Sequence, residues 1–303
     1  MDKLLLKAWR RMSPDLAHGP WRLGSFDWLT SAVRMVRAAK EDDYGTAASA
    51  IAFASFLALL PMLGAVALTY GMVTSPDRVV ADIRSLIFIL PIDARQFIGD
   101  WLIRSITRSE GREAGLLIAI AIALFSAMRA GRTIMRALNT ASEVETRRGF
   151  VRRQTVALAI VFAGAVLVLG SLFVIASLTW VERVLPIGLA GVLRGIFWPP
   201  AIGGAAASLT LVYRYTPNWS PPPWRWIFPG ALFATILWLL ATLGFGWYVS
   251  HFGRTELTYG SVGAIVVLQL WLFLSAYVML LGAKLNTELM RCAGMHANSE
   301  ARL

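Results

Sequence analysis

The stretch IVVLQLWLFLSAYVMLL (Ile265–Leu281) decides the fold class, because it carries no charge and shows no alternation of apolar and polar side chains. A second stretch, VALAIVFAGAVLVL (Val156–Leu169), has the same character. A membrane-spanning β-strand has about 10 residues and alternates, whereas a spanning helix needs about 20 mainly apolar residues. Lipid leaves no partner for an unpaired backbone group, so these stretches predict transmembrane helices.

The composition of the whole chain agrees with a membrane location. Of its 303 residues, 57% are hydrophobic and 16% are charged, and the mean hydropathy is +0.60. A soluble domain has about 45–50% apolar and about 25% charged residues, so a soluble class is excluded. Five long uncharged stretches, and a sixth of 15 residues between Glu113 and Arg129 that spans if it is extended through Arg129 toward Leu138, predict an all-α, polytopic membrane protein. Its six transmembrane helices are expected near residues 46–70, 112–138, 154–180, 194–213, 227–250 and 260–284.

The distribution of Lys and Arg predicts the orientation. With six spans, both termini share a side with the second and fourth loops, and these segments carry 20 of the 29 basic residues. Positive charge stays cytoplasmic, so the chain is expected to divide into a cytoplasmic segment 1–43, a transmembrane domain 44–290 and a cytoplasmic tail 291–303. This excess also explains the net charge of +11 without a nucleic-acid partner.

Residues 26–40 predict a short amphipathic helix, and the loop around residues 83–106 predicts two more. Apolar and basic residues of the first helix recur at helical spacing on different sides: Phe26, Leu29, Val33 and Val36 against Arg34, Arg37 and Lys40. An interfacial helix on an anionic leaflet has this pattern. A cytoplasmic helix packed against the bundle has it too, and both interpretations stay open.

A polar face at the end of the second predicted span is the first candidate site. Its members follow one another at intervals of three and four residues: Arg129, Arg132, Arg136, Asn139 and Glu143. This spacing places them on one helical face. Charged groups at the hydrocarbon boundary usually face the bundle interior or an aqueous cavity, and guanidinium groups match phosphate or carboxylate. The alternative is that the arginines only anchor the helix by reaching the membrane surface.

Two further pairs complete the residue-based candidates. Lys284 and Glu288 lie four residues apart, which indicates a structural ion pair at the membrane edge or a part of the site. Tyr213 and Arg214 end the fourth span and would line the same cytoplasmic vestibule. Tracks of small residues allow close helix packing within one chain or between copies, so a monomer and a homo-oligomer both fit.

No catalytic, metal or cofactor site is expected. The three histidines lie in separate regions, at His18, His251 and His296, and the phosphate-binding pattern G-x-x-x-x-G-K-[ST] is absent. A single cysteine, Cys292, excludes an intrachain disulfide. The chain is therefore expected not to be an enzyme.

Four stretches in order resemble the YihY/BrkB family of bacterial inner-membrane proteins, sometimes labelled ribonuclease BN-like. They are Ala47–Pro61 (AASAIAFASFLALLP), Ser126–Arg153 with Asn139 and Arg148–Phe150, Tyr213–Asn218 (YRYTPN), and Tyr259–Leu289 with its Tyr-Gly start and Gly-Ala-x-Leu-Asn end. The resemblance covers residues 40 to 290 and adds Tyr259 to the candidate site. It implies a six-helix inner-membrane protein, but no agreed activity. Lys284 stands where many relatives look acidic, so the role of that acid would pass to Glu288.

Three functions follow as hypotheses. The first is transport or flipping of an anionic substrate, lipidic or not, with anionic membrane lipids as partners. The second is a non-transporting membrane scaffold that serves envelope integrity. A ribonuclease is the least favoured, because the acidic residues are scattered over loops and two-metal hydrolysis needs clustered carboxylates.

Overall fold

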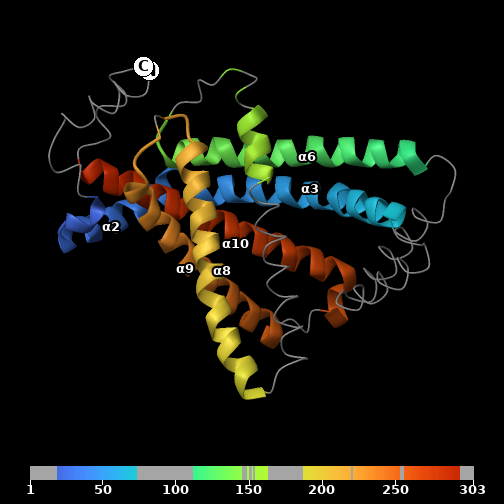
Figure 1. The fold of residues 1–303 in the computed structure, drawn as a ribbon. Helices are drawn as coiled ribbons and strands as arrows, with labels where there is room; N and C mark the ends of the chain where they lie inside the picture. The colour runs from blue at the N-terminus through green and yellow to red at the C-terminus, as the bar shows by residue number, and fades with distance from the viewer. Residues whose placement is uncertain are drawn as a thin grey trace. The chain divides into compact units, whose positions relative to one another are not determined.

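The computed structural model describes residues 19–73, 112–144, 149, 152, 154–162, 187–219, 221–252 and 256–293. These residues form helices and turns, with no β-strand among them. The helices are the short 3₁₀ helix η2 (Pro20–Arg22), α2 (Ser25–Glu41), α3 (Tyr44–Val73), α6 (Arg112–Ala141), α8 (Ile187–Tyr215), α9 (Trp224–Phe252) and α10 (Glu256–Cys292) (Figure 1). The all-α prediction is therefore confirmed for this part of the chain.

Five of the six predicted spans lie on observed helices, namely α3, α6, α8, α9 and α10. The third, near 154–180, is helical over residues 154–162, and its remainder lies outside the described residues. The predicted helices near 83–106, the first 18 residues and the tail after residue 293 lie outside them as well. Within the described residues, Trp224–Val249 of α9 and Ile265–Cys292 of α10 are long and apolar enough to cross a membrane. The number of six spans stays a prediction.

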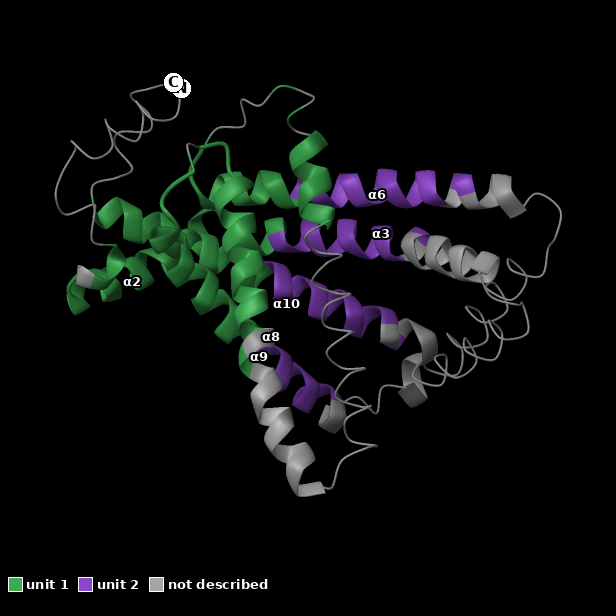
Figure 2. Ribbon diagram, viewed as in Figure 1, with its two compact units in different colours: residues 1–47, 134–238, 277–303 green, residues 48–133, 239–276 purple. Residues whose placement is uncertain are grey.

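The chain divides into two compact units (Figure 2). Unit 1 comprises residues 1–47, 134–238 and 277–303, and unit 2 comprises residues 48–133 and 239–276. Unit 1 thus contains α2, the last turns of α6, the whole of α8, the first half of α9 and the end of α10. Both units draw on the predicted domain 44–290.

Small residues are buried in unit 2 while large apolar ones are exposed. On α3, Ala48 and Ala52 are fully buried, but Phe53 is 58% exposed. On α9, Leu240 and Leu243 are 61% and 71% exposed. Soluble proteins rarely leave large contiguous apolar patches open to water, whereas small residues between helices and large ones outside are typical of helices packed in lipid.

The connection between α2 and α3 is two residues long because Asp43 adopts a left-handed conformation, with φ of 48°. Its carboxylate Oδ1 accepts the backbone N–H of Thr46 at 3.3 Å and so caps the first turn of α3. Hydrogen bonds from the side chain and the backbone of Thr46 hold the pKa of Asp43 below its usual range. This short turn places Tyr44 at the edge of unit 1.

The end of α10 is the centre of unit 1, since every residue from 282 to 290 is buried. Leu285 and Leu289 pack against Met35 of α2, with partly buried neighbours around them. On the other side, α10 crosses α9 so closely that a Cβ atom on Gly282 would lie 2.6 Å from the backbone oxygen of Gly230. The two glycines therefore set the approach of these helices.

Candidate functional site

Polar side chains are concentrated in the buried last turns of α10. Each of four is at most 1% exposed: Lys284, Asn286, Thr287 and Glu288. A buried polar group costs free energy unless it is hydrogen-bonded, and a buried charge costs more unless it is paired. The partners of these groups thus define the site.

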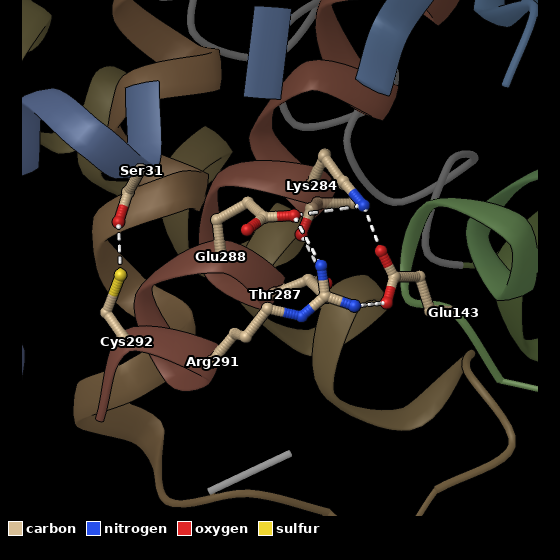
Figure 3. Close-up of polar contacts among 8 residues, drawn as sticks. Ser31, Glu143, Lys284, Thr287, Glu288, Arg291 and Cys292 are labelled. Atoms are coloured by element: carbon tan, nitrogen blue, oxygen red, sulfur yellow. Dashed lines mark hydrogen bonds and ion pairs between the residues drawn. The ribbon is translucent and has the colours of Figure 1, made fainter. Parts of the chain in front are cut away.

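Four charged residues form one ion cluster, consisting of Glu143, Lys284, Glu288 and Arg291 (Figure 3). Lys284 pairs with Glu288, with Nζ and Oε1 separated by 3.1 Å, and also with Glu143. Arg291 binds Glu143 and lies 3.4 Å from Glu288 Oε1 through its Nη1. The two negative and two positive charges cancel, so the cluster is neutral. The predicted Lys284–Glu288 pair is confirmed.

Glu143 reaches this cluster because of an unusual backbone at the end of α6. The N–H of Val144 donates to the carbonyl of Asn139 at 3.0 Å, and the N–H of Glu143 donates to that of Thr140 at 3.0 Å. This is a Schellman motif, in which the left-handed position is usually a glycine. Here it is Glu143, with φ of 54°. A left-handed non-glycine residue costs roughly 1–2 kcal/mol, and the two ion pairs of its carboxylate offset that cost.

Two oxygen atoms beside the cluster are buried without a hydrogen-bond partner among the described residues: the hydroxyl of Tyr44 and Oε2 of Glu288. A tyrosine hydroxyl is protonated at neutral pH and so keeps its donor. The cluster retains one acceptor and one donor that the ion pairs do not use.

Asn286 joins α10 to α9 at the place where a proline interrupts the helix. Pro229 lies inside α9 and has no N–H to donate. Asn286 Oδ1 accepts the N–H of Gly230 at 2.7 Å, and Asn286 Nδ2 donates to the carbonyl of Ile227 at 2.8 Å. The side-chain amide thus bonds the backbone on both sides of Pro229.

Replacing Asn286 with leucine is expected to destabilise the protein by about 2–4 kcal/mol, because two buried backbone groups lose their partners. Thermal unfolding of the purified protein in detergent, followed by size-exclusion chromatography, measures the change. Thr235→Val is the matched control, since among the described residues the hydroxyl of Thr235 bonds within α9, to Ala231. Equal unfolding midpoints for the two variants would contradict the bridging role.

Asn139 and Tyr213 hold structural hydrogen bonds. Asn139 Oδ1 accepts the backbone N–H of Asn218 at 3.0 Å, which fastens the segment after α8 to α6. The hydroxyl of Tyr213 donates to the carbonyl of Met279 on α10 at 2.7 Å. Both predicted site residues therefore join helices of unit 1, and a direct role toward a substrate stays a prediction.

Arg214 lies against two aromatic rings near the end of α8, and the rings also contact each other edge to face. Its Cζ atom lies 4.5 Å from the ring centroid of Trp224 and 5.5 Å from that of Tyr215. The Nε and Nη1 atoms are buried and have no hydrogen-bond partner in the part of the chain that the structure describes. The rings contribute cation–π attraction, but they offer no acceptor to these N–H groups.

The remaining predicted residues are three arginines of α6 and Tyr259 of α10. Arg129 and Arg136 are exposed, and Arg132 is half-buried and has an interaction of its own. The face continues into the buried Asn139, because the end of α6 is covered within unit 1. Tyr259 belongs to α10, but its side chain lies outside the described residues.

Three contributors to this region are missing from the sequence-based candidates: Tyr44, Asn286 and Arg291. Asn286 stands in the Gly-Ala-x-Leu-Asn motif, and this signal could have identified it. Nothing in the spacing links Arg291 or Tyr44 to Glu143. Among the described residues, no group of three or more His, Cys, Asp and Glu side chains could hold a metal ion.

Comparison with protein families gives one match, to the family described as virulence factor BrkB, over residues 35–302. A ribonuclease-like protein of Bacillus subtilis, YfkH, is 31% identical over 198 residues, which cover 62% of this chain and 71% of YfkH. No solved structure matches the chain.

Other relatives carry the description UPF0761 membrane protein. The one from Ralstonia nicotianae is 29% identical over 260 residues, covering 84% of this chain and 57% of the relative. The one from Azoarcus is 29% identical over 249 residues, covering 80% and 59%. The chain thus spans less than two thirds of the length of these two relatives.

Proposed function

The chain belongs to the BrkB family of membrane proteins, and from this premise we propose that it transports or flips an anionic substrate. The substrate class is an organic anion with phosphate or carboxylate oxygens, for which anionic phospholipid is the first candidate. The proposal includes no catalytic step. It places the protein in the bacterial inner membrane as a multi-pass protein with both termini cytoplasmic.

The observation that carries the proposal is the guanidinium group of Arg214. A buried donor without an acceptor costs about 1–3 kcal/mol, and more when the group is charged. Among the residues that the structure describes, no acceptor meets two such donors on this one side chain, Nε and Nη1. Carboxylate and phosphate oxygens match the guanidinium fork in charge and geometry. An anionic substrate would therefore supply the missing acceptor.

The surroundings of Arg214 suit a ligand that arrives from the membrane surface. The rings of Tyr215 and Trp224 are 50% and 46% exposed, and aromatic rings of this kind favour the interfacial depth. The carbonyl of Arg214 accepts the indole N–H of Trp219 at 3.2 Å, which fixes the segment that follows α8. Movement of an exposed ring is the step that would open the guanidinium edge.

The exposed positions of Arg129 and Arg136 on α6 also support the proposal. The outward side chains of α6 in unit 2 are apolar before Arg129, as Leu117 at 69% and Phe125 at 60% exposed show. Exposed arginines that come directly after an apolar surface along a helix would lie at the depth of the lipid head groups. They would attract anions there, whether or not those anions are then moved.

Purified protein in vesicles tests the proposal by the movement of fluorescent phosphatidylglycerol between leaflets. Arg214→Gln and the triple variant of Arg129, Arg132 and Arg136 to glutamine are each expected to lower the rate at least about tenfold, the equivalent of 1.4 kcal/mol. Arg152→Gln is the control, since Arg152 is also exposed but lies outside this set. Unchanged rates in both variants, for phosphatidylglycerol and for small organic anions, would contradict the proposal.

A membrane scaffold is the second candidate, favoured by the tight α9–α10 crossing and by the neutral ion cluster in unit 1. Both features are typical of a rigid support. A scaffold would bind anionic lipid without moving it faster than protein-free vesicles do. A ribonuclease activity would instead appear as RNA cleavage by the purified protein.

A further inference from the structure

Helix α2 has two apolar faces, and the described residues cover one of them. The covered face contains Ser31, Met35 and Ala39, all at most 5% exposed. The other face leaves four apolar side chains between 52% and 76% exposed: Phe26, Leu29, Val33 and Val36. We call these four residues the outer stripe. The covered face fits a helix packed against the bundle, and the outer stripe fits an interfacial helix, the two interpretations that the sequence left open.

The covered face packs α2 against the rest of unit 1. Met35 packs in one cluster with Leu285 and Leu289 of α10, and Trp28 lies against the same cluster. The hydroxyl of Ser31 and the thiol of Cys292 lie 3.4 Å apart. At 100° per residue, Met35 lies on the opposite side of the helix from the middle of the outer stripe. This packing therefore orients the outer stripe away from the rest of unit 1.

Basic side chains on one flank and at the end of the outer stripe match a phospholipid surface. Arg34 and Arg37 lie on that flank, Lys40 continues the stripe one turn after Val36, and all three are exposed. The two acidic residues of the helix are engaged locally: Asp27 accepts the N–H of Gly24 at 3.1 Å, and Glu41 pairs with Arg37 at 2.9 Å. At the start of the segment, the ring of Trp21 is 61% exposed and lies 5.9 Å from that of Trp28.

We propose that α2 lies in the cytoplasmic interface of the bilayer, with the outer stripe in the acyl boundary and Arg34 and Lys40 at the lipid phosphates. An apolar stripe with basic residues on one flank and at its end, and a tryptophan near its start, are features of an interfacial helix. Burial of the stripe removes apolar area from water and so favours this placement. The proposal concerns anchoring and holds whether or not the protein transports anything.

Spin labels on single cysteines test this placement in the full chain. Cys292→Ser removes the one native thiol and keeps a hydroxyl beside Ser31. In this background, labels are attached at Val33→Cys and Arg34→Cys, with Phe26→Cys as a second probe of the outer stripe. The protein is reconstituted in vesicles of phosphatidylethanolamine and phosphatidylglycerol, and the collisions of each label with oxygen and with a water-soluble nickel chelate are measured.

The labels at Val33 and Phe26 are expected to meet oxygen in preference to nickel, because oxygen concentrates in the acyl region. The label at the adjacent Arg34 should show the reverse preference. Equal nickel access at Val33 and Arg34 would overturn the proposal, since the outer stripe would then face water. A label on the outer stripe that neither oxygen nor the nickel chelate reaches would overturn the proposal, because protein would then cover the stripe. A spectrum broadened by the label of a second copy would overturn it for the same reason.

Discussion

Replacement of Lys284 by methionine is expected to lower the free energy of unfolding by about 3–5 kcal/mol, the usual effect of removing one partner of a buried ion pair. The side chains of Lys284 and Glu288 are each 2% exposed. Without the ammonium group, Glu288 stays buried beside Arg291, and Glu143 keeps its ion pair with Arg291 but loses the one with Lys284. Thermal or denaturant unfolding in detergent measures the loss.

The exposed pair of Arg37 and Glu41 provides the control, because these side chains are 78% and 64% exposed. Arg37→Ala should change stability by no more than about 1 kcal/mol. The double variant with Lys284→Met and Glu288→Leu should recover much of the loss, since the orphaned charge is removed. If Lys284→Met is as mild as Arg37→Ala, the ion cluster has no structural role.

Gly230→Ala is expected to destabilise unit 1 by about 3 kcal/mol or more, at the upper end of overpacking effects. The new Cβ atom would lie 2.5 Å from Asn286 Oδ1 and closer still to the backbone oxygen of Gly282. The obstructing atom is backbone, so α9 and α10 would have to separate. Loss of folded protein on size-exclusion chromatography after heating is the readout.

Gly244 of the same helix is the control, since no atom of the described residues lies within 4 Å of the position that its Cβ atom would take. Gly244→Ala should leave stability equal or slightly raised, because alanine favours the helix by roughly 0.5–1 kcal/mol. Equal losses in the two variants would mean that the crossing of α9 and α10 is not set by its glycines.

The uncharged stretches predict where the helices lie better than where they end. They place the end of the last span at Lys284, yet α10 continues to Cys292. A charge ordinarily marks the end of an apolar segment, but Lys284 stays inside unit 1 because Glu143 and Glu288 neutralise it. The second predicted span ends near residue 138, whereas α6 runs to Ala141 and is followed by the left-handed Glu143.

The site is predictable from sequence only where its members are neighbours along the chain. The Lys284–Glu288 pair follows from helical spacing, since the two residues lie four apart. The partner that completes it, Glu143, is 141 residues away from Lys284, and only the fold brings them together. Asn286 is similar, because its two bonds depend on the approach of α9 at Gly230.

The central claim, an anion bound by Arg214, is tested most directly by an experimental structure of the full chain in nanodiscs containing phosphatidylglycerol. We predict density for an acidic head group within hydrogen-bond distance of Nε or Nη1, and loss of that density in Arg214→Gln. The claim would be contradicted if the density is absent from both proteins and protein groups bond the guanidinium of Arg214. The other arginines would then lie only at the membrane surface. The scaffold interpretation would then replace transport.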